Sequence, residues 1–186
     1  VFTLIGFISA YYDKEFVRII LGDEYVNKTI ENIEKGNAVG VYQQGSNWGT
    51  SIAIIFNNLK VGAVLFIYGV FGGVGTLYAL LQNSIMLGSF QYFFHEHGAL
   101  KESASGIWLH GVFEIFSMVV EAMAGLILGA SILFPKTYSR FNSFKLGFKD
   151  SFKIFLSTVP FTIVAGIIEG YVTRYALVMP GIINIL

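Results

Sequence analysis

Four ionisable side chains lie inside long apolar stretches of this chain, where the neighbouring residues are almost all hydrophobic. His110, Glu114 and Glu121 lie in one stretch, and Glu169 lies in another. Spacings of four and seven residues place the first three on one face of a helix. Imidazole and carboxylate groups can bind a divalent metal ion or relay protons, and such groups at membrane depth are functional candidates by default. The pattern therefore predicts a buried polar or ion-binding centre.

The position of Glu169 in its own stretch matches the position of Glu114. Each residue lies about 7 or 8 residues from the outer end of its helix, which is roughly 10 to 12 Å at about 1.5 Å per residue. His110 lies one turn above Glu114, so we predict that His110, Glu114 and Glu169 form one site. Three interpretations stay open: a divalent-metal site, a proton or cation pathway, and a structural cluster that hydrogen bonds to hydroxyls such as Thr162 and Thr173.

The sequence argues against an enzyme. The segment His110-Gly-Val-Phe-Glu114 has one His and one Glu, whereas a zinc protease helix carries H-E-x-x-H. Gly72-Gly73-Val74-Gly75 lacks the Lys of a phosphate-binding loop, and the chain has no Cys. We therefore predict a non-enzymatic protein, with a membrane metallohydrolase as the weaker alternative. A divalent metal is the cofactor that the polar residues suggest.

The composition is that of a membrane protein. Hydrophobic residues make up 54% of the chain, charged residues 13%, and mean hydropathy is +0.65. Ordinary soluble domains have about 45 to 50% apolar and about 25% charged residues. A formal net charge of zero gives no electrostatic basis for binding nucleic acid. We predict an all-α, polytopic transmembrane helical bundle that forms a single membrane domain over residues 1–186.

Four apolar segments reach the roughly 20 residues needed to cross a bilayer. They are residues 50–69, 70–94, 106–134 and 154–176. Residues 1–10 are too few to cross, so we expect them to be the end of a truncated span and the chain to be a fragment. Asn57, Asn58 and Lys60 are unfavourable in a lipid-facing span. This stretch is therefore also compatible with a re-entrant half-helix buried in protein.

The basic residues predict the orientation. Residues 135–153 hold five bases and one acid, whereas residues 11–47 hold six acids and four bases. Because Lys and Arg favour cytoplasmic loops, residues 135–153 should be cytoplasmic and residues 11–47 outside. A tight hairpin between the first two spans brings all loop charges into agreement. The predicted location is the cell inner membrane, with multiple passes.

The outside segment carries its own helical pattern. Apolar residues recur at helical spacing and end near Gly36, which is typical of a helix C-terminus. These residues are Phe16, Ile19, Ile20, Val26, Ile30 and Ile33. We predict one amphipathic extracytoplasmic helix over residues 16–35. It either caps the bundle or binds membrane or extracytoplasmic protein partners.

Two pairs of glycines are spaced four residues apart in the later spans. Gly125 with Gly129, and Gly166 with Gly170, match the small-xxx-small pattern that permits close helix packing in membranes. We predict that the two helices carrying these pairs pack together. The expected environment is the lipid bilayer, and a homo-oligomer is compatible with the sequence.

Several segments together resemble a known family of integral membrane proteins. His110-Gly-Val-Phe-Glu114, Ala124-Gly125-Leu126 and the run from Ile168 to Thr173 are similar to the pattern of the stage II sporulation protein M family. The stretch from Tyr25 through Gly36 to Tyr42, Asn57-Asn58, and Gly72 to Thr76 extend the similarity over nearly the whole chain. Glu121 stands where that pattern has a small residue, and Ile127 where a basic residue is frequent.

The resemblance implies a bacterial or archaeal polytopic membrane protein. The namesake is similar to a scaffold that anchors peptidoglycan-degrading partners during engulfment in spore formers, although the family extends to organisms that form no spores. The expected function is therefore a scaffold or partner-anchoring component. The alternative is an ion- or proton-coupled transporter or channel component that uses His110, Glu114 and Glu169.

Overall fold

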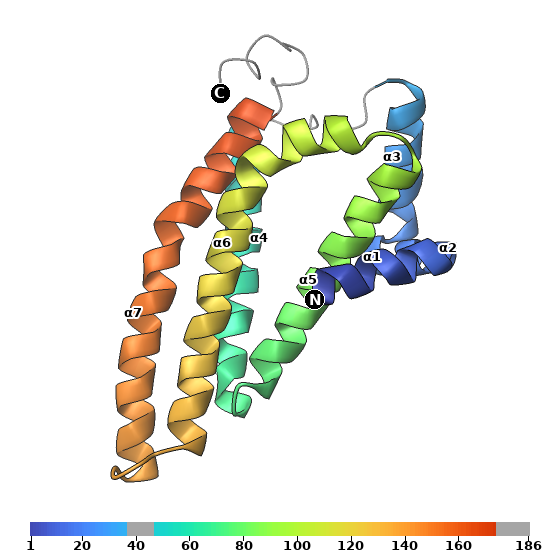
Figure 1. Ribbon diagram of the computed structural model, residues 1–186. Helices are drawn as coiled ribbons and strands as arrows, with labels where there is room; N and C mark the ends of the chain where they lie inside the picture. The colour runs from blue at the N-terminus through green and yellow to red at the C-terminus, as the bar shows by residue number, and fades with distance from the viewer. Residues whose placement is uncertain (37–46, 174–186) are drawn as a thin grey trace. The chain divides into compact units, whose positions relative to one another are not determined.

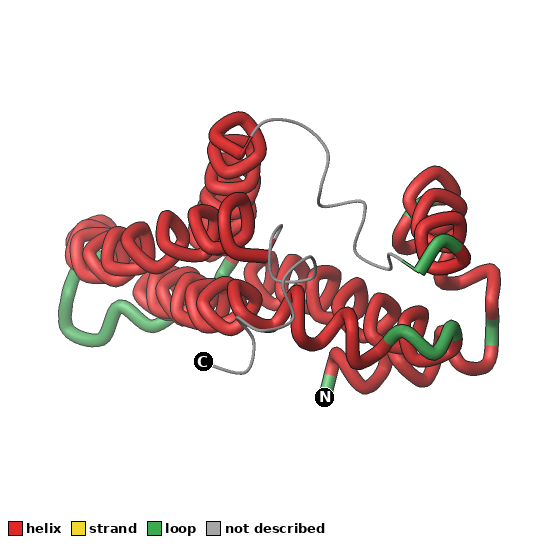
Figure 2. The backbone as a smooth tube through the Cα atoms, turned by 90° about the horizontal axis from the view of Figure 1, so that it is seen from above, coloured by secondary structure: helices red, strands yellow, loops and turns green. Residues whose placement is uncertain are grey.

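Helices form nearly all of the computed structural model, which describes residues 1–36 and 47–173. The helices are α1 (Phe2–Tyr12), α2 (Lys14–Leu21), α3 (Asp23–Glu34), α4 (Asn47–Ile67), the short 3₁₀ helix η2 (Tyr68–Phe71), α5 (Val74–Glu96), α6 (Leu100–Leu133), α7 (Arg140–Ile167) and the π-helix η3 (Ile168–Thr173) (Figure 1). The described residues contain no strand (Figure 2). The predicted all-α class is confirmed.

Three helical stretches in the described part of the chain are long and apolar enough to cross a membrane. They are Asn47–Phe71, Trp108–Leu133 and Arg140–Thr173, with mean hydropathies of 1.7, 2.0 and 1.8. The protein is thus a membrane protein, as predicted. The expected span at residues 70–94 corresponds to the helix α5, whose 23 residues include Gln82, Asn83 and Gln91, so that it is less apolar than these three stretches. The last span begins at Arg140 rather than at residue 154.

The amphipathic segment forms two helices instead of the single one predicted. Gly22 has a φ of +85°, a left-handed conformation that favours glycine, and it separates α2 from α3. Asp13 caps α2, because its side chain accepts a hydrogen bond from the Glu15 backbone N–H at 3.0 Å. The break turns Ile19 outward, where it is 75% exposed, while Val17 and Val26 are buried.

The described chain divides into two compact units. Unit 1 comprises Val1–Ser51, Gln82–His110 and Ile167–Leu186, and unit 2 comprises Ile52–Leu81 and Gly111–Gly166. In unit 1, an apolar core joins α1, α2, α3 and α5. Its buried members are Ala10, Val17, Val26, Tyr92, Phe93, Phe94 and Ala99. The helix α1 approaches α5 closely, since a Cβ on Gly88 would lie 2.0 Å from the Thr3 carbonyl oxygen.

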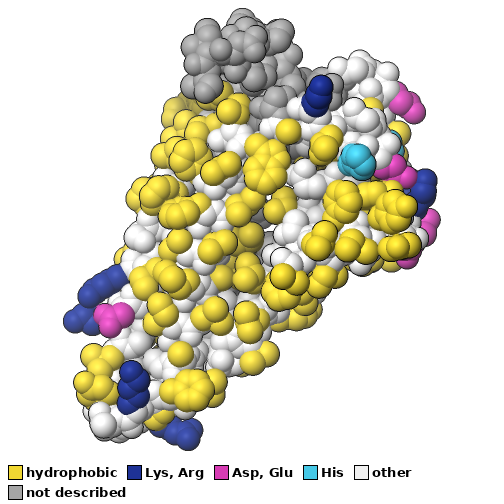
Figure 3. All heavy atoms as spheres, viewed as in Figure 1, with side chains coloured by type: hydrophobic (Ala, Val, Ile, Leu, Met, Phe, Trp, Pro, Cys, Tyr) yellow, Lys and Arg dark blue, Asp and Glu magenta, His cyan; other side chains and the backbone are white. Residues whose placement is uncertain are grey.

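In unit 2, the apolar cores join α4, α5, α6 and α7. Leu65 packs with Ala79 and Ala122, and Phe66 packs with Ala124, Leu128 and the aromatic rings of α7. The Phe66 and Phe155 rings stack with their centroids 5.3 Å apart. Large apolar side chains on α6 and α7 point outward, which suits lipid contact (Figure 3). They include Val112, Phe116, Val119, Met123, Phe161 and Val164.

The glycines of unit 2 allow its helices to approach closely. A Cβ on Gly125 would lie 2.3 Å from the Leu65 carbonyl oxygen of α4, and one on Gly129 would lie 2.2 Å from the Gly73 nitrogen. Gly72 and Gly73 have φ values of +67° and +82°, so glycine makes the predicted tight hairpin between α4 and α5. The spacing predicted that α6 and α7, which carry the two glycine pairs, pack together, and these helices do contact each other, for example through Phe116 and Phe161. The close approach at Gly125 and Gly129, however, is to this hairpin.

Gly166 and Gly170, the other predicted pair, have different surroundings. Gly166 is buried near the end of α7. In unit 1, a Cβ on Gly170 would lie 1.9 Å from the Ser51 hydroxyl oxygen and 3.0 Å from the Asn47 carbonyl oxygen. The start of α4 is therefore the close partner of Gly170. The spacing indicated close approach but could not identify the partner helix.

We predict that Gly125→Ala destabilises the protein by about 1 to 3 kcal/mol, because overpacking forces helices apart. The new methyl group would meet the Leu65 carbonyl oxygen and the Thr76 hydroxyl, which hydrogen bond to each other at 2.8 Å. Gly111→Ala on the same helix is the matched control, since a Cβ there meets nothing within 4 Å. Thermal unfolding in detergent should show a lower midpoint for Gly125→Ala alone. Equal midpoints for both variants would contradict the packing described here.

Candidate functional site

His110 of α6 and Glu169 of η3 face each other in unit 1. Both are buried, with 2% and 8% of their surface exposed. The His110 Nε2 lies 3.6 Å from Glu169 Oε2, and His110 Nδ1 lies 2.9 Å from the Thr173 hydroxyl oxygen. Glu169 and Thr173 reach the same imidazole because both lie in the π-helical turn that ends α7. The pairing of His110 with Glu169, and Thr173 as a hydroxyl partner, agree with the sequence pattern.

Glu114 lies on the same face of α6, one turn after His110, and belongs to unit 2. Its Oε1 accepts a hydrogen bond from the Asn58 side-chain amide of α4. This contact explains how a polar residue fits inside an apolar span, because Asn58 faces protein while its neighbours Asn57 and Lys60 are exposed. Here α4 is one continuous helix from Asn47 to Ile67, and no re-entrant element is needed.

Glu121 continues the polar face of α6 in unit 2 and is 2% exposed. Its Oε1 accepts a hydrogen bond from the Thr158 hydroxyl of α7 at 2.9 Å. Gly62 of α4 lies against the carboxyl group, and a Cβ there would come within 2.3 to 2.5 Å of the carboxyl atoms. The carboxyl thus fills the space that a side chain at position 62 would occupy.

The polar residues of α6 therefore contact different helices. His110 contacts η3, Glu114 contacts α4, and Glu121 contacts α7. The sequence pattern did not identify Asn58 or Thr158 as partners. Their signal was present, since each is a hydrogen-bonding residue inside an apolar span, but a single sequence does not show which face of a helix meets which neighbour.

The predicted His110, Glu114 and Glu169 each carry a donor atom suited to a metal ion. In unit 1, His110 and Glu169 supply one imidazole nitrogen and one carboxylate, two of the three or four ligands that protein zinc takes. Glu114 belongs to unit 2. The common metal site therefore stays a prediction.

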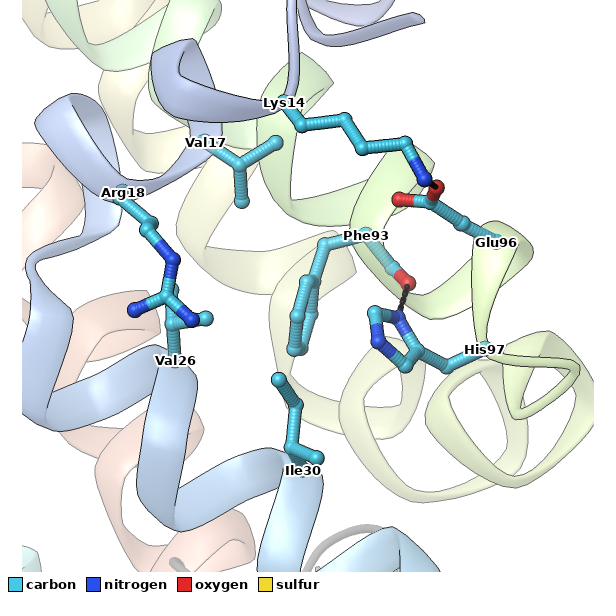
Figure 4. A pocket seen from close by; sticks show the side chains of 8 residues that line it. All are labelled: Lys14, Val17, Arg18, Val26, Ile30, Phe93, Glu96 and His97. Atoms are coloured by element: carbon cyan, nitrogen blue, oxygen red, sulfur yellow. Dashed lines mark hydrogen bonds and ion pairs between the residues drawn. The ribbon is translucent and has the colours of Figure 1, made fainter.

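Unit 1 also contains a pocket of about 210 Å³ between α2, α3 and α5 (Figure 4). Its floor is apolar and its rim is charged. The floor consists of Val17, Val26, Ile30 and Phe93, and the rim of Lys14, Arg18, Glu96 and His97. The spacing of the apolar residues predicted a packed helix face here but gave no indication of a cavity.

Each basic side chain of the pocket rim has an acidic or amide partner. Lys14 Nζ lies 2.8 Å from Glu96 Oε1, and this carboxylate raises the pKa of the Lys14 ammonium. Arg18 donates hydrogen bonds of 2.9 Å to Asp23 and to Asn27. Positive and negative groups are thus paired around an apolar floor. Such a pocket suits an apolar side chain flanked by polar groups.

The imidazole of His97 adds a hydrogen-bond acceptor to the rim. Its Nδ1 lies 2.8 Å from the Phe93 carbonyl oxygen, which can only accept, so Nδ1 carries the hydrogen. In neutral His97 the Nε2 is therefore an acceptor. Figure 4 shows the ring turned toward Phe93 and Ile30.

We predict that Asn58→Ala destabilises the protein by about 1 to 3 kcal/mol, because it removes the amide that donates to the Glu114 carboxylate inside an apolar span. Asn57→Ala is the matched control, since Asn57 is the next residue of the same helix and is exposed. It should change the free energy of unfolding by no more than about 0.5 kcal/mol. Denaturant unfolding in mixed micelles measures both variants. A similar loss for both would show that the contact contributes nothing.

A search among curated proteins and among solved structures found no match. A family model described as Stage II sporulation protein M matches residues 1–174, which is nearly the whole chain. The match includes the polar face of α6, the pocket of unit 1 and the three helices that can cross a membrane. This chain belongs to the stage II sporulation protein M family.

Proposed function

We propose that this protein is a non-enzymatic membrane scaffold that anchors an extracytoplasmic protein partner through the pocket of unit 1. The observation that carries the proposal is the pocket itself, with its apolar floor and paired rim charges. Protein interfaces gain most of their binding energy where an apolar or aromatic anchor fills a desolvated pocket. The occupant would be an apolar side chain of the partner, and the polar rim would orient the segment that carries it.

The polar rim is better suited to orienting the bound segment than to attracting a partner by its net charge. Lys14 is paired with Glu96, and Arg18 with Asp23, so positive and negative groups alternate around the opening. Exposed ion pairs of this kind contribute little to stability. Their disruption should therefore affect partner recognition more than folding.

The proposal requires the pocket to lie outside the cytoplasm, with residues 11–47 outside and residues 135–153 in the cytoplasm of the inner membrane. The charge distribution supports this orientation, because residues 135–153, which form the turn after α6 and the first part of α7, hold five bases and one acid. Figure 3 shows Lys and Arg side chains near the turn between α6 and α7.

Single cysteines at two exposed positions test the orientation in this Cys-free chain. A membrane-impermeant thiol reagent applied to intact cells should label position 31 and spare position 145. After permeabilisation, both positions should react, which controls for accessibility. Labelling of position 145 but not position 31 in intact cells would reverse the assigned orientation.

A charge reversal at the pocket rim tests partner anchoring. With a photo-crosslinker at position 24 of α3, the unaltered pocket should give a protein adduct, and Lys14→Glu should reduce its yield several-fold. Lys35→Glu is the matched control, because it also breaks an exposed ion pair, with Glu31, but lies outside the pocket.

Two results would contradict partner anchoring. One is an adduct yield that falls equally with Lys14→Glu and Lys35→Glu. The other is crosslinking to lipid alone from position 24 in the unaltered protein. Either result would favour α2 and α3 as a cap over the rest of the chain.

A second candidate function is an ion- or proton-coupled transport component. The close approach of buried His110 and Glu169 favours it, since acidic and His residues inside membranes mark ion pathways. Under this alternative, Lys14→Glu would leave function intact, whereas His110 or Glu169 substitutions would abolish it. The partner experiment therefore separates the two candidates.

A further inference from the structure

The carboxyl group of Glu121 is buried in unit 2, whereas the partner pocket belongs to unit 1. It lies between Gly62 of α4 and Thr158 of α7, and 2% of the residue is exposed. Burying a carboxylate without a compensating cation is strongly unfavourable. Among the described residues, no ion pair joins Glu121 to a basic side chain.

The hydrogen bond from Thr158 does not compensate the charge. The Thr158 hydroxyl lies 2.9 Å from Glu121 Oε1 and 2.7 Å from the Phe155 carbonyl oxygen, and it has one hydrogen to donate. Glu121 therefore receives at most a shared bond from a neutral donor. A proton or a small cation must balance the carboxylate.

A second polar group points to a bound ligand. Ser117 lies one turn before Glu121 on the same face of α6 and is 3% exposed. Its hydroxyl oxygen is buried and has no hydrogen-bond partner in the described part of the chain. Buried polar atoms in native structures are nearly always satisfied, so an orphan beside a buried carboxyl indicates a missing partner.

We propose that Glu121, Ser117 and Thr158 form a binding site for a monovalent cation, either a proton or a sodium ion. The charge decides the valence, because one carboxylate and two neutral hydroxyls balance one positive charge. The donor type decides the chemistry, since hard cations take carboxylate and hydroxyl oxygens. Around the carboxyl, α4 presents Gly62 and α7 presents Thr158, and neither side chain is charged.

The site is independent of the proposed scaffold function. It uses residues of unit 2, whereas the partner pocket and the His110 with Glu169 pair belong to unit 1. A negative result in the crosslinking experiment would not contradict the cation site. Failure to detect the cation site would likewise not contradict partner anchoring.

Dicyclohexylcarbodiimide tests the proposal, because it modifies protonated carboxyl groups in apolar surroundings. The whole chain in liposomes would be treated across a range of pH, with the modified residue identified by mass spectrometry. We expect modification of Glu121 at low pH that declines as pH rises. Glu121→Gln should abolish it while keeping a hydrogen-bonding side chain.

Added salt identifies the occupant. Protection of Glu121 by NaCl, but not by choline chloride at equal ionic strength, would assign sodium. Loss of modification with pH alone would assign the proton. Absence of modification at every pH, or modification independent of both pH and sodium, would overturn the site.

Ser117→Ala separates ligand binding from a structural role. Removal of its hydroxyl should weaken binding of the occupant about tenfold, which raises the sodium concentration for half-protection about tenfold or moves half-modification about one pH unit downward where the proton is the occupant. Ser151→Ala is the matched control, because Ser151 is also buried in unit 2 but bonds to the Gly147 carbonyl of its own helix. Identical profiles for wild type and Ser117→Ala would overturn the assignment of Ser117.

Discussion

The satisfaction of polar groups away from water is the constraint on which this structure depends. The helix α6 carries His110, Glu114, Ser117 and Glu121 on one face of an otherwise apolar span. In lipid, an unsatisfied polar group is unfavourable by several kcal/mol, so this face must contact protein. Neighbouring segments supply the contacts: Asn58 from α4, Thr158 from α7 and Thr173 from η3. The polar face thereby determines how α6 is rotated about its own axis.

Close packing acts together with these polar contacts to hold the helices against one another. Without a hydrophobic driving force between helices in lipid, association relies on van der Waals contact and hydrogen bonds. Gly125 and Gly129 bring α6 against the hairpin of α4 and α5, where a single methyl group would collide with backbone atoms. Gly62 serves a different purpose, because its missing side chain leaves the space that the Glu121 carboxyl occupies. Glycine therefore supports both tight packing and the placement of a charged group.

Much of the fold could be predicted from the sequence, because composition and periodicity report directly on environment. The all-α class, the membrane location and the turn at Gly72 and Gly73 followed from hydropathy and from the conformational freedom of glycine. The break at Gly22 was missed, because apolar spacing continues through it and one glycine is compatible with a helix interior. The segment expected to span at residues 70–94 forms the helix α5, whose polar residues lower its hydropathy below that of the three apolar stretches.

The candidate site was predicted less completely, for a physical reason. Helical spacing places residues on a face of one helix but carries no information about the neighbouring helix. Matched depth, which a sequence contains as distance along a helix, related Glu169 to Glu114, whereas the structure pairs Glu169 with His110 one turn away. Asn58 and Thr158 as partners, and the pocket beneath Lys14 and Arg18, depend on helix rotation and on side-chain volume in three dimensions. No local pattern in a single sequence reports how a helix is rotated or how side chains fill the space between helices.

The π-helical turn η3 makes the geometry around His110 sensitive to chain length. A π-helical turn forms hydrogen bonds between residues five apart, whereas an α-helix forms them between residues four apart. It therefore accommodates one extra residue within the helix. Loss of one residue between Glu169 and Thr173 would restore ordinary α-helical winding and leave the two side chains three positions apart instead of four. Such a change would turn Thr173 away from the imidazole without altering any side chain named above. Insertions and deletions here would therefore act on the buried histidine as strongly as a substitution of its partners.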